Sequence, residues 1–231
     1  MKKVIPLSIV LLPLLVANGA NASDYQNKAF VGASVDEISM HSTLKNGGDN
    51  VKFNDSSFGG SINAGYKAYF LEQSNGSFFV TPEFSWNFTS LDKKKVTNDG
   101  NSYGSPNTFQ DVDYAKYTAK PMFAFDLATG YELNQKHSIF AGIGLQYLKA
   151  ELKGYSYTYN IANGDVVDVS DTYSKTEYKL GYRAFAGYEY NLTNAVSLNA
   201  KVTYSYTEPK FNGIKVETDL VDYSLGVKYN F

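Results

Sequence analysis

Residues 218–231 read TDLVDYSLGVKYNF, and this stretch decides the fold because its apolar side chains recur at every second position. Counted back from Phe231, the apolar set is Tyr229, Val227, Leu225, Tyr223 and Val221. The residues between them are Asn230, Lys228, Gly226, Ser224 and Asp222. A period of two is typical of a β-strand with one apolar and one polar face. The chain therefore ends on a strand that can place one face in lipid and the other in a polar interior.

This ending resembles the closing strand of bacterial outer-membrane β-barrels, whose members commonly finish on a Phe preceded by alternating apolar residues. The resemblance covers residues 29–231 and points to the eight-stranded opacity, OmpA-like and OmpX-like surface proteins, some of them porin-like. It implies that Tyr229 and Phe231 belong to the signal that the barrel-assembly machinery reads. It also implies a monomer in the outer membrane of a Gram-negative bacterium, in contact with membrane lipid and lipopolysaccharide.

The beginning of the chain predicts export. Lys2 and Lys3 precede an apolar run over residues 4–16, and Ala20-Asn21-Ala22 supplies a cleavage site. The run is broken by Pro6 and Pro13 and is shorter than the ~20 apolar residues that span a bilayer. We therefore expect a signal peptide over residues 1–22 and a mature barrel over residues 23–231.

The remaining chain contains eight segments that alternate between apolar and polar residues. Residues 73–76, 134–137 and 191–194 are short turns, and longer connections rich in polar residues are expected at 41–56, 92–116, 154–175 and 208–217. This pattern predicts an all-β fold, an eight-stranded antiparallel up-and-down transmembrane β-barrel. Pro82 lies inside one strand and requires a bulge or a lost backbone hydrogen bond. The strands are expected at residues 29–36, 58–70, 78–88, 123–133, 139–147, 178–190, 196–206 and 218–231.

A soluble β-sandwich or lipocalin-like barrel is the competing fold, because alternation alone does not say which face is inside. One face of all eight segments lacks charge through its centre, whereas the other carries charges, glycines and serines. The chain also contains 20 Tyr, 15 Phe and one Trp. Membrane barrels place such aromatic side chains in girdles at the two membrane interfaces. The distribution favours the membrane barrel.

The polar face predicts ion pairs inside the barrel. Glu83, Asp126, Arg183 and Lys201 are expected at mid-height, with Lys67, Glu132, Glu189 and Lys228 nearer the short turns. A buried charge needs a partner, so these side chains should pair, and Arg183 should bind Glu83 or Asp126. The alternative is a gate, in which Arg183 switches between carboxylates and opens a narrow channel.

The sequence offers little for catalysis or for cofactors. His41 lies beside Ser39 and Ser42 in an expected loop, an arrangement that a rim-located lipid-modifying enzyme could use. With two histidines and no cysteine, neither a metal site nor a cysteine nucleophile is expected, and no cofactor is implied. A formal net charge of −2 argues against nucleic acid as a partner. We expect a protein that is not an enzyme.

The connections on the side away from the short turns are the expected functional surface. The lysines 93–95 could contact phosphates of lipopolysaccharide. Tyr155, Tyr157, Tyr159 and Tyr173 lie among Ser, Thr and Asp, a composition found in adaptable binding surfaces. We therefore expect a surface protein that presents four extracellular loops for adhesion or other recognition. A host or surface molecule is the expected ligand of these loops. The barrel should also support envelope integrity. A narrow porin-like channel and a lipid-modifying enzyme are the alternatives.

Overall fold

The computed structural model describes residues 25–46, 49–98, 102–103, 109–160 and 164–231, so the expected signal peptide lies outside the described residues. No helix among the described residues is long and apolar enough to span a bilayer. All regular structure in them is β-strand. The strands are β1 (Lys28–Asn46), β2 (Asp49–Gln73), β3 (Gly76–Asn87), β4 (Leu91–Asn98), β5 (Ser102–Tyr103), β6 (Phe109–Leu133), β7 (His137–Asn160), β8 (Val166–Asn191), β9 (Val196–Thr207), β10 (Lys210–Phe211) and β11 (Ile214–Asn230).

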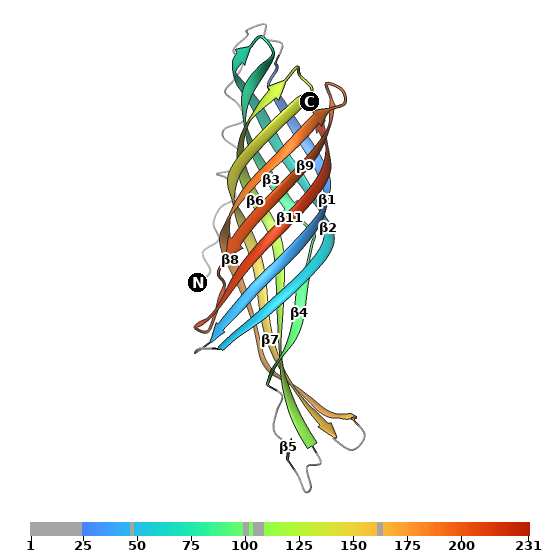
Figure 1. The fold of residues 1–231 in the computed structure, drawn as a ribbon, viewed down its shortest axis with the longest axis vertical. Coiled ribbons are helices and arrows are strands. Elements are labelled where there is room, and N and C mark those ends of the chain that lie inside the picture. The colour runs from blue at the N-terminus through green and yellow to red at the C-terminus, as the bar shows by residue number, and fades with distance from the viewer. Residues whose placement is uncertain (1–24, 47–48, 99–101, 104–108, 161–163) are drawn as a thin grey trace, which may run out of the picture.

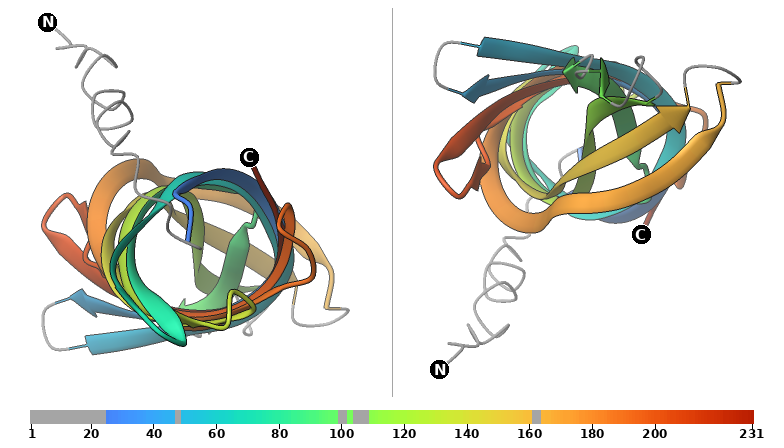
Figure 2. Two further views of the ribbon diagram at one scale, coloured as in Figure 1. Left: turned by 90° about the horizontal axis from the view of Figure 1, so that it is seen from above. Right: turned by 90° about the horizontal axis from the view of Figure 1, so that it is seen from below.

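The strands form one closed antiparallel ring. The strands pair in the order β1-β2-β3-β6-β7-β8-β9-β11, and β11 returns to pair with β1 from Phe30↔Asn230 to Lys45↔Lys215. Viewed along the barrel axis, the strands follow one another around a closed ring (Figure 2). β4 continues the path of β3 and pairs with β6, while β10 pairs with β11. The eight-stranded antiparallel barrel predicted from the sequence is confirmed.

The outer surface carries a continuous apolar belt. Ile139 and Ile143 are each 70% exposed, and Leu225 is 65% exposed, as expected for side chains that meet lipid rather than protein. At one boundary of the belt, Trp86, Phe123, Tyr147 and Tyr178 follow one another across β3, β6, β7 and β8 with ring centroids 5.7–6.4 Å apart. The other boundary carries Phe70, Phe78, Tyr131, Tyr188, Tyr229 and Phe231.

Short turns close one end of the barrel, which we call the turn end, and the opposite end we call the hairpin end (Figure 1). The three predicted turns lie at 74–75, 134–136 and 192–195. Asn134 and Gln135 have φ angles of 51° and 58°, which Asn adopts more readily than most residues. The prediction for Pro82 is also met, because the pairing of β2 with β3 lapses between Gly65↔Glu83 and Ala68↔Val80.

The expected loops at the hairpin end are wrong, because most of their residues are strand. β1 continues to Asn46 and β2 begins at Asp49, so residues 41–56 form a β-hairpin. In the same way, β7 reaches Asn160 and β8 begins at Val166, within the segment expected to be a loop. Of the segment 92–116, β4 occupies Leu91–Asn98, and β6 begins at Phe109.

The apolar residues change face where the strands leave the belt. In β1 the outward side chains are Val31 and Val35 within the belt, whereas Ile38, Met40 and Leu44 beyond it point inward and are buried. The outward residues beyond the belt are polar, as with Glu37 and His41. This inversion has a simple cause. A barrel wall in lipid exposes apolar groups, whereas a barrel wall in water buries them.

Glycines let aromatic rings fill the interior of the belt region. Each of three inward glycines lies against a phenylalanine ring, and a Cβ added there would come within 2.5 Å of it. The distances are 2.5 Å for Gly130 and Phe79, 2.4 Å for Gly142 and Phe185, and 2.4 Å for Gly187 and Phe140. These three rings form a buried cluster with Ala128. The inward glycines are therefore needed for packing, since the interior of eight strands is only wide enough for side chains.

Candidate functional site

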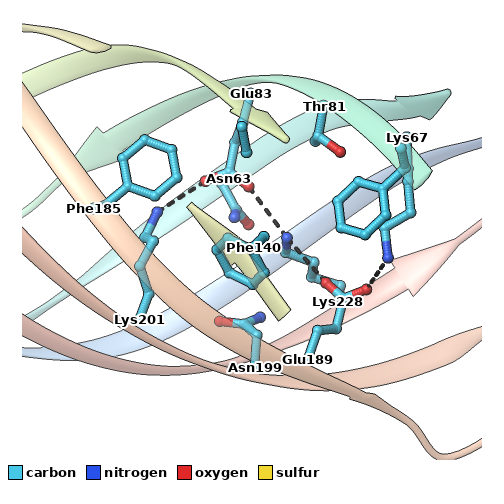
Figure 3. Close-up of a pocket in the computed structure, with 12 residues that line it drawn as sticks. Asn63, Lys67, Thr81, Glu83, Phe140, Phe185, Glu189, Asn199, Lys201 and Lys228 are labelled. Carbon is cyan, nitrogen blue, oxygen red and sulfur yellow. Dashed lines mark hydrogen bonds and ion pairs between the residues drawn. The ribbon is translucent and has the colours of Figure 1, made fainter. Parts of the chain in front are cut away.

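Eight charged side chains inside the barrel form one unbroken series, which we call the ion chain. Acids and bases alternate along it, and each neighbouring pair is joined by a salt bridge of 2.5–3.8 Å. Figure 3 shows its central part, where Lys228 lies between Glu83 and Glu189. From the turn end, the order is Glu132, Lys67, Glu189, Lys228, Glu83, Lys201, Asp126 and Arg183.

Aromatic rings line the ion chain and keep it from water. The ammonium of Lys228 lies 4.2 Å from the ring centroid of Phe30, and that of Lys67 lies 4.6 Å from Phe79. Lys67 and Lys228 are each 6% exposed. Burial of this degree makes each charge dependent on its neighbours, because an unpaired charge in such a site costs several kcal/mol.

The structure brings together all four lumenal residues singled out in the sequence. Nε of Arg183 lies 3.3 Å from Oδ1 of Asp126, and Nζ of Lys201 lies 3.0 Å from Oε1 of Glu83 and 3.8 Å from Oδ2 of Asp126. Of the two carboxylates expected for Arg183, the one in contact is thus Asp126. Lys201 joins the two pairs, so the four side chains form a single connected group.

An apolar cluster lies inside the barrel on the hairpin side of the ion chain, and we call it the apolar plug. Its buried members come from seven strands around the ring, so it crosses the interior from wall to wall. Tyr117, which is fully buried, bonds through its hydroxyl to Thr218 at 2.8 Å, and burial raises the pKa of this phenol. The members are Ile38, Met40, Leu44, Phe53, Leu91, Tyr117, Ala119, Leu148, Ala150, Leu152, Phe211, Val216 and Leu220.

The turn end is also covered. Tyr25 is 9% exposed and packs on Tyr69, with ring centroids 5.5 Å apart. Tyr69 in turn donates a hydrogen bond from its hydroxyl to Glu132, the first member of the ion chain, at 2.7 Å. The segment before β1 therefore contributes a ring to the barrel interior, a contact that no pattern in the sequence indicates.

The hairpin end carries a second candidate site on the outer face of the strands that project furthest beyond the ring (Figure 1). Nζ of Lys94 lies 4.0 Å from the ring centroids of both Tyr114 and Tyr157, and it donates to the Tyr157 hydroxyl at 2.9 Å. Tyr155 is 5.7 Å from the same ammonium, and Tyr159 stacks on Tyr157. We call these five residues the tyrosine–lysine surface.

Strand register explains why this surface exists. Lys94 pairs with Lys116 of β6, and Lys116 pairs with Lys153 of β7, so three ammonium groups lie in one row. Lys116 is bound by Asp92 at 2.9 Å. Lys153 donates to Glu151 at 2.8 Å and holds the pKa of that carboxyl below its usual value. The sequence pointed to the lysines and three of these tyrosines separately, but Tyr114 was missed and the contact depends on the register of β4 with β6.

The histidine considered for catalysis does not meet its serines. His41 is exposed on the outer face of β1, whereas Ser42 points inward and donates a hydrogen bond to Thr218 at 3.1 Å. Ser39 shares the outer face, where its hydroxyl lies 3.0 Å from that of Ser56. His41 and Ser42 therefore lie on opposite faces of the wall. No group of three metal-ligating side chains occurs within the part of the chain that the structure describes.

Comparison with known proteins places this geometry in a family. The family model described as "Outer membrane protein beta-barrel domain" matches residues 9–231. A comparison with curated proteins gave no match.

Solved structures with similar folds share little sequence with this chain. The attachment invasion locus protein Ail of Yersinia pestis is 17% identical, with 87% of this chain and 98% of Ail covered and a TM-score of 0.35. Neisserial surface protein A is 17% identical over 90% of this chain and 100% of its own, with a TM-score of 0.39. OprG of Pseudomonas aeruginosa is 14% identical over 88% and 96% of the two chains, with a TM-score of 0.41. By its family match, the chain belongs to the β-barrel proteins of the Gram-negative outer membrane and crosses that membrane as an eight-stranded antiparallel barrel.

Proposed function

We propose that this protein recognises a partner at the cell surface through the tyrosine–lysine surface. The observation that carries the proposal is the position of Lys94 between Tyr114 and Tyr157, on strands that extend beyond the apolar belt. Tyrosine offers a large contact area at a small cost in side-chain entropy, and a surface rich in it suits protein recognition. Because a rigid barrel supports these strands, the surface is held in place before a partner arrives.

The neighbouring strand edge favours a polypeptide as this partner. β8 pairs with β9 only from Tyr182 to Asn191, so in the described structure its residues 166–181 form strand pairs with β7 alone. An unpaired edge can accept an extended segment of another chain through main-chain hydrogen bonds. The exposed side chains Val166 and Val169 lie on this part of β8, where Tyr157 pairs with Val169. Such a partner would contact the edge and the tyrosine–lysine surface together.

Lipopolysaccharide is the expected partner nearer the membrane. Lys120 and Lys149 pair across β6 and β7, and Lys149 follows two residues after Tyr147 of the aromatic girdle. Along a strand, two residues span about 6.6 Å, so these ammonium groups lie just beyond the apolar belt. Lipid phosphates occupy this level, and lysines there are favourable for anionic headgroups. Contacts of this kind would anchor the barrel and support envelope integrity.

A narrow channel is less well supported than surface recognition. Ions crossing the barrel would have to pass the apolar plug, whose members Phe53, Leu148 and Phe211 are fully buried. They would then have to separate the pairs of the ion chain and displace Tyr25 from Tyr69. Each step exposes apolar surface or breaks a buried ion pair, and both cost free energy. No interaction seen among the described residues would offset these costs.

The proposal is tested with the variant Lys94→Ala/Tyr155→Ala/Tyr157→Ala on the surface of a non-adherent bacterium. We expect at least a tenfold loss of attachment to host cells and matrix proteins, without loss of the folded barrel on unheated gels. Lys52→Ala is the matched control, because Lys52 is exposed on the β1–β2 hairpin, which projects in a different direction from the β7–β8 hairpin (Figure 2). Full attachment by the triple variant, or an equal loss with Lys52→Ala, would refute the assignment.

A further inference from the structure

Two carboxylates lie inside the barrel without a place in the ion chain. Asp36 of β1 and Asp222 of β11 line one polar cavity between the ion chain and the apolar plug. Asp222 is the register partner of Ile38, a member of the plug. The cavity measures about 10 Å³, and it is also lined by Ser34, Asn63, Glu83, Arg183, Asn199, Lys201 and Ser224.

Both aspartates have a buried oxygen that accepts no hydrogen bond among the described residues. For Asp36 this atom is Oδ2, and for Asp222 it is Oδ1. The other oxygen of Asp36 accepts a bond from Ser34 at 2.7 Å, and Asp36 is only 1% exposed. A buried carboxylate oxygen without a donor is costly, so these atoms point to a missing hydrogen-bond partner.

The nearby bases cannot neutralise both aspartates. Asp222 interacts electrostatically with Asp36, Arg183, Lys201 and Asp126. Arg183 is already in contact with Asp126, and Lys201 bridges Asp126 and Glu83. The ion chain alternates four acids with four bases, so Asp36 and Asp222 are two acids in excess beside it. The charge of Asp36 in the same cavity therefore opposes the ionisation of Asp222.

Water alone does not remove the repulsion between the two carboxylates, although one water could donate to their unpartnered oxygens. A single water needs about 10–15 Å³, so the cavity holds one water at most. A metal ion is not favoured either, since no group of three metal-ligating side chains is present among the described residues. A proton on one carboxyl removes the repulsion and supplies the donor that the unpartnered oxygens lack.

We propose that Asp222 and Asp36 form a proton-binding site, in which the carboxyl group of Asp222 carries the proton at neutral pH. The protonated group donates to the other carboxylate directly or through the single water. Arg183 then stays with Asp126, because only one negative charge remains on the aspartate pair. When the site loses its proton, the second charge competes for Arg183 and Lys201 and weakens the ion chain under the plug.

The sign of the pH effect follows from linkage. In the unfolded chain both aspartates have ordinary pKa values near 3.9, so they are ionised at neutral pH. The folded barrel binds one proton more than the unfolded chain between that value and the pH at which the site titrates. Its stability therefore falls as pH rises through this range and levels off above it.

Two measurements on the refolded barrel in detergent test the site. Infrared spectra report the carbonyl stretch of a protonated carboxylic acid, a band that ionised carboxylates lack. We expect this band in the wild type at neutral pH, and its loss at alkaline pH. Asp36→Asn and Asp222→Asn should each abolish it, whereas the exposed control Asp168→Asn should keep it. Absence of the band from the wild type at neutral pH would overturn the proposal, even if both variants failed to fold.

The second measurement is the urea midpoint of unfolding from about pH 5 to about pH 9. We expect the wild-type and Asp168→Asn midpoints to fall with pH, and those of Asp36→Asn and Asp222→Asn to fall less. Parallel curves for all four proteins would overturn the proposal. Replacing sodium by choline should change nothing, and a midpoint that requires sodium would show a metal cation in place of the proton.

Discussion

Nε of Arg183 and Oδ1 of Asp126 lie 3.3 Å apart at one end of an ion chain that reaches Glu132 at the other. Arg183 is the only arginine of the chain, and it is 6% exposed. Its side chain also donates to Thr203 at 3.3 Å. The pair forms the end of the ion chain beside the polar cavity. A substitution at either residue should therefore weaken the neighbouring ion pairs of the chain.

Removal of Arg183 should destabilise the barrel strongly. In Arg183→Ala, Asp126 loses its closest cation, and we expect the free energy of unfolding to fall by about 3–5 kcal/mol, as for other broken buried pairs. Urea titration followed by the fluorescence of the single Trp86 measures this. Arg183→Ala/Asp126→Ala should recover part of the loss, because no uncompensated charge remains. An unchanged midpoint for the single variant would mean that water hydrates these charges independently.

A charge in the middle of the apolar belt should be costly. Ile143 is 70% exposed and lies midway along the belt part of β7, between Ile139 and Tyr147. We expect Ile143→Arg to lower the free energy of unfolding in lipid by about 2–4 kcal/mol. Ser56→Arg, on the outer face of β2 beyond the belt, is the control and should cost little. Equal effects of the two substitutions would contradict the position of the membrane.

The apolar plug should behave like the core of a soluble protein. Leu148 is fully buried in the plug, so Leu148→Ala should cost about 2–5 kcal/mol of unfolding free energy. Leu145→Ala on the same strand is the matched control, because Leu145 is 49% exposed and lipid chains can fill the space it leaves. Denaturant unfolding compares the two. A larger loss from Leu145 than from Leu148 would contradict the arrangement.

Shortening the projecting hairpin should separate recognition from conductance. Lys153 pairs with Ser174, so a short turn can join them in place of residues 154–173. Changing a connection's length costs little, about 0.6 kcal/mol per doubling, so the ring should still fold. We expect attachment to be lost. Planar-bilayer current should stay at its wild-type level, and a current that appears only in the intact protein would favour the channel.

The sequence predicted the ring because each strand in the belt obeys a period of two with one uncharged face. In β11, Leu225 was expected outward and Lys228 inward, and their exposed fractions of 65% and 6% confirm both. The same reasoning failed beyond the belt. The Asn, Gly and Ser content of residues 41–56 predicts a loop, whereas the structure has a β-hairpin there. Yet the apolar residues Ile38, Met40 and Leu44 continue the period of two at even-numbered positions. This indicates that the strand goes on with its apolar face turned inward.

The pairings inside the barrel needed information that one strand does not contain. Arg183 faces inward by alternation, but its choice of Asp126 over Glu83 depends on how eight strands are staggered. The contact of Lys94 with Tyr114 likewise depends on the pairing of β4 with β6, which includes an irregularity between Val96 and Asn98. Neither stagger nor bulges can be derived from the residue pattern of a single segment.

The change of face in β1 has an evolutionary consequence. Within the belt, the outward residues Val31 and Val35 are constrained by lipid to remain apolar. Past Asp36 the constraint moves to the opposite set of positions, where Met40 is fully buried. The outward positions there, among them Glu37 and His41, face water and can drift without disturbing the packing beneath. The outward side of these hairpins can therefore be replaced residue by residue while the strands that display it stay the same.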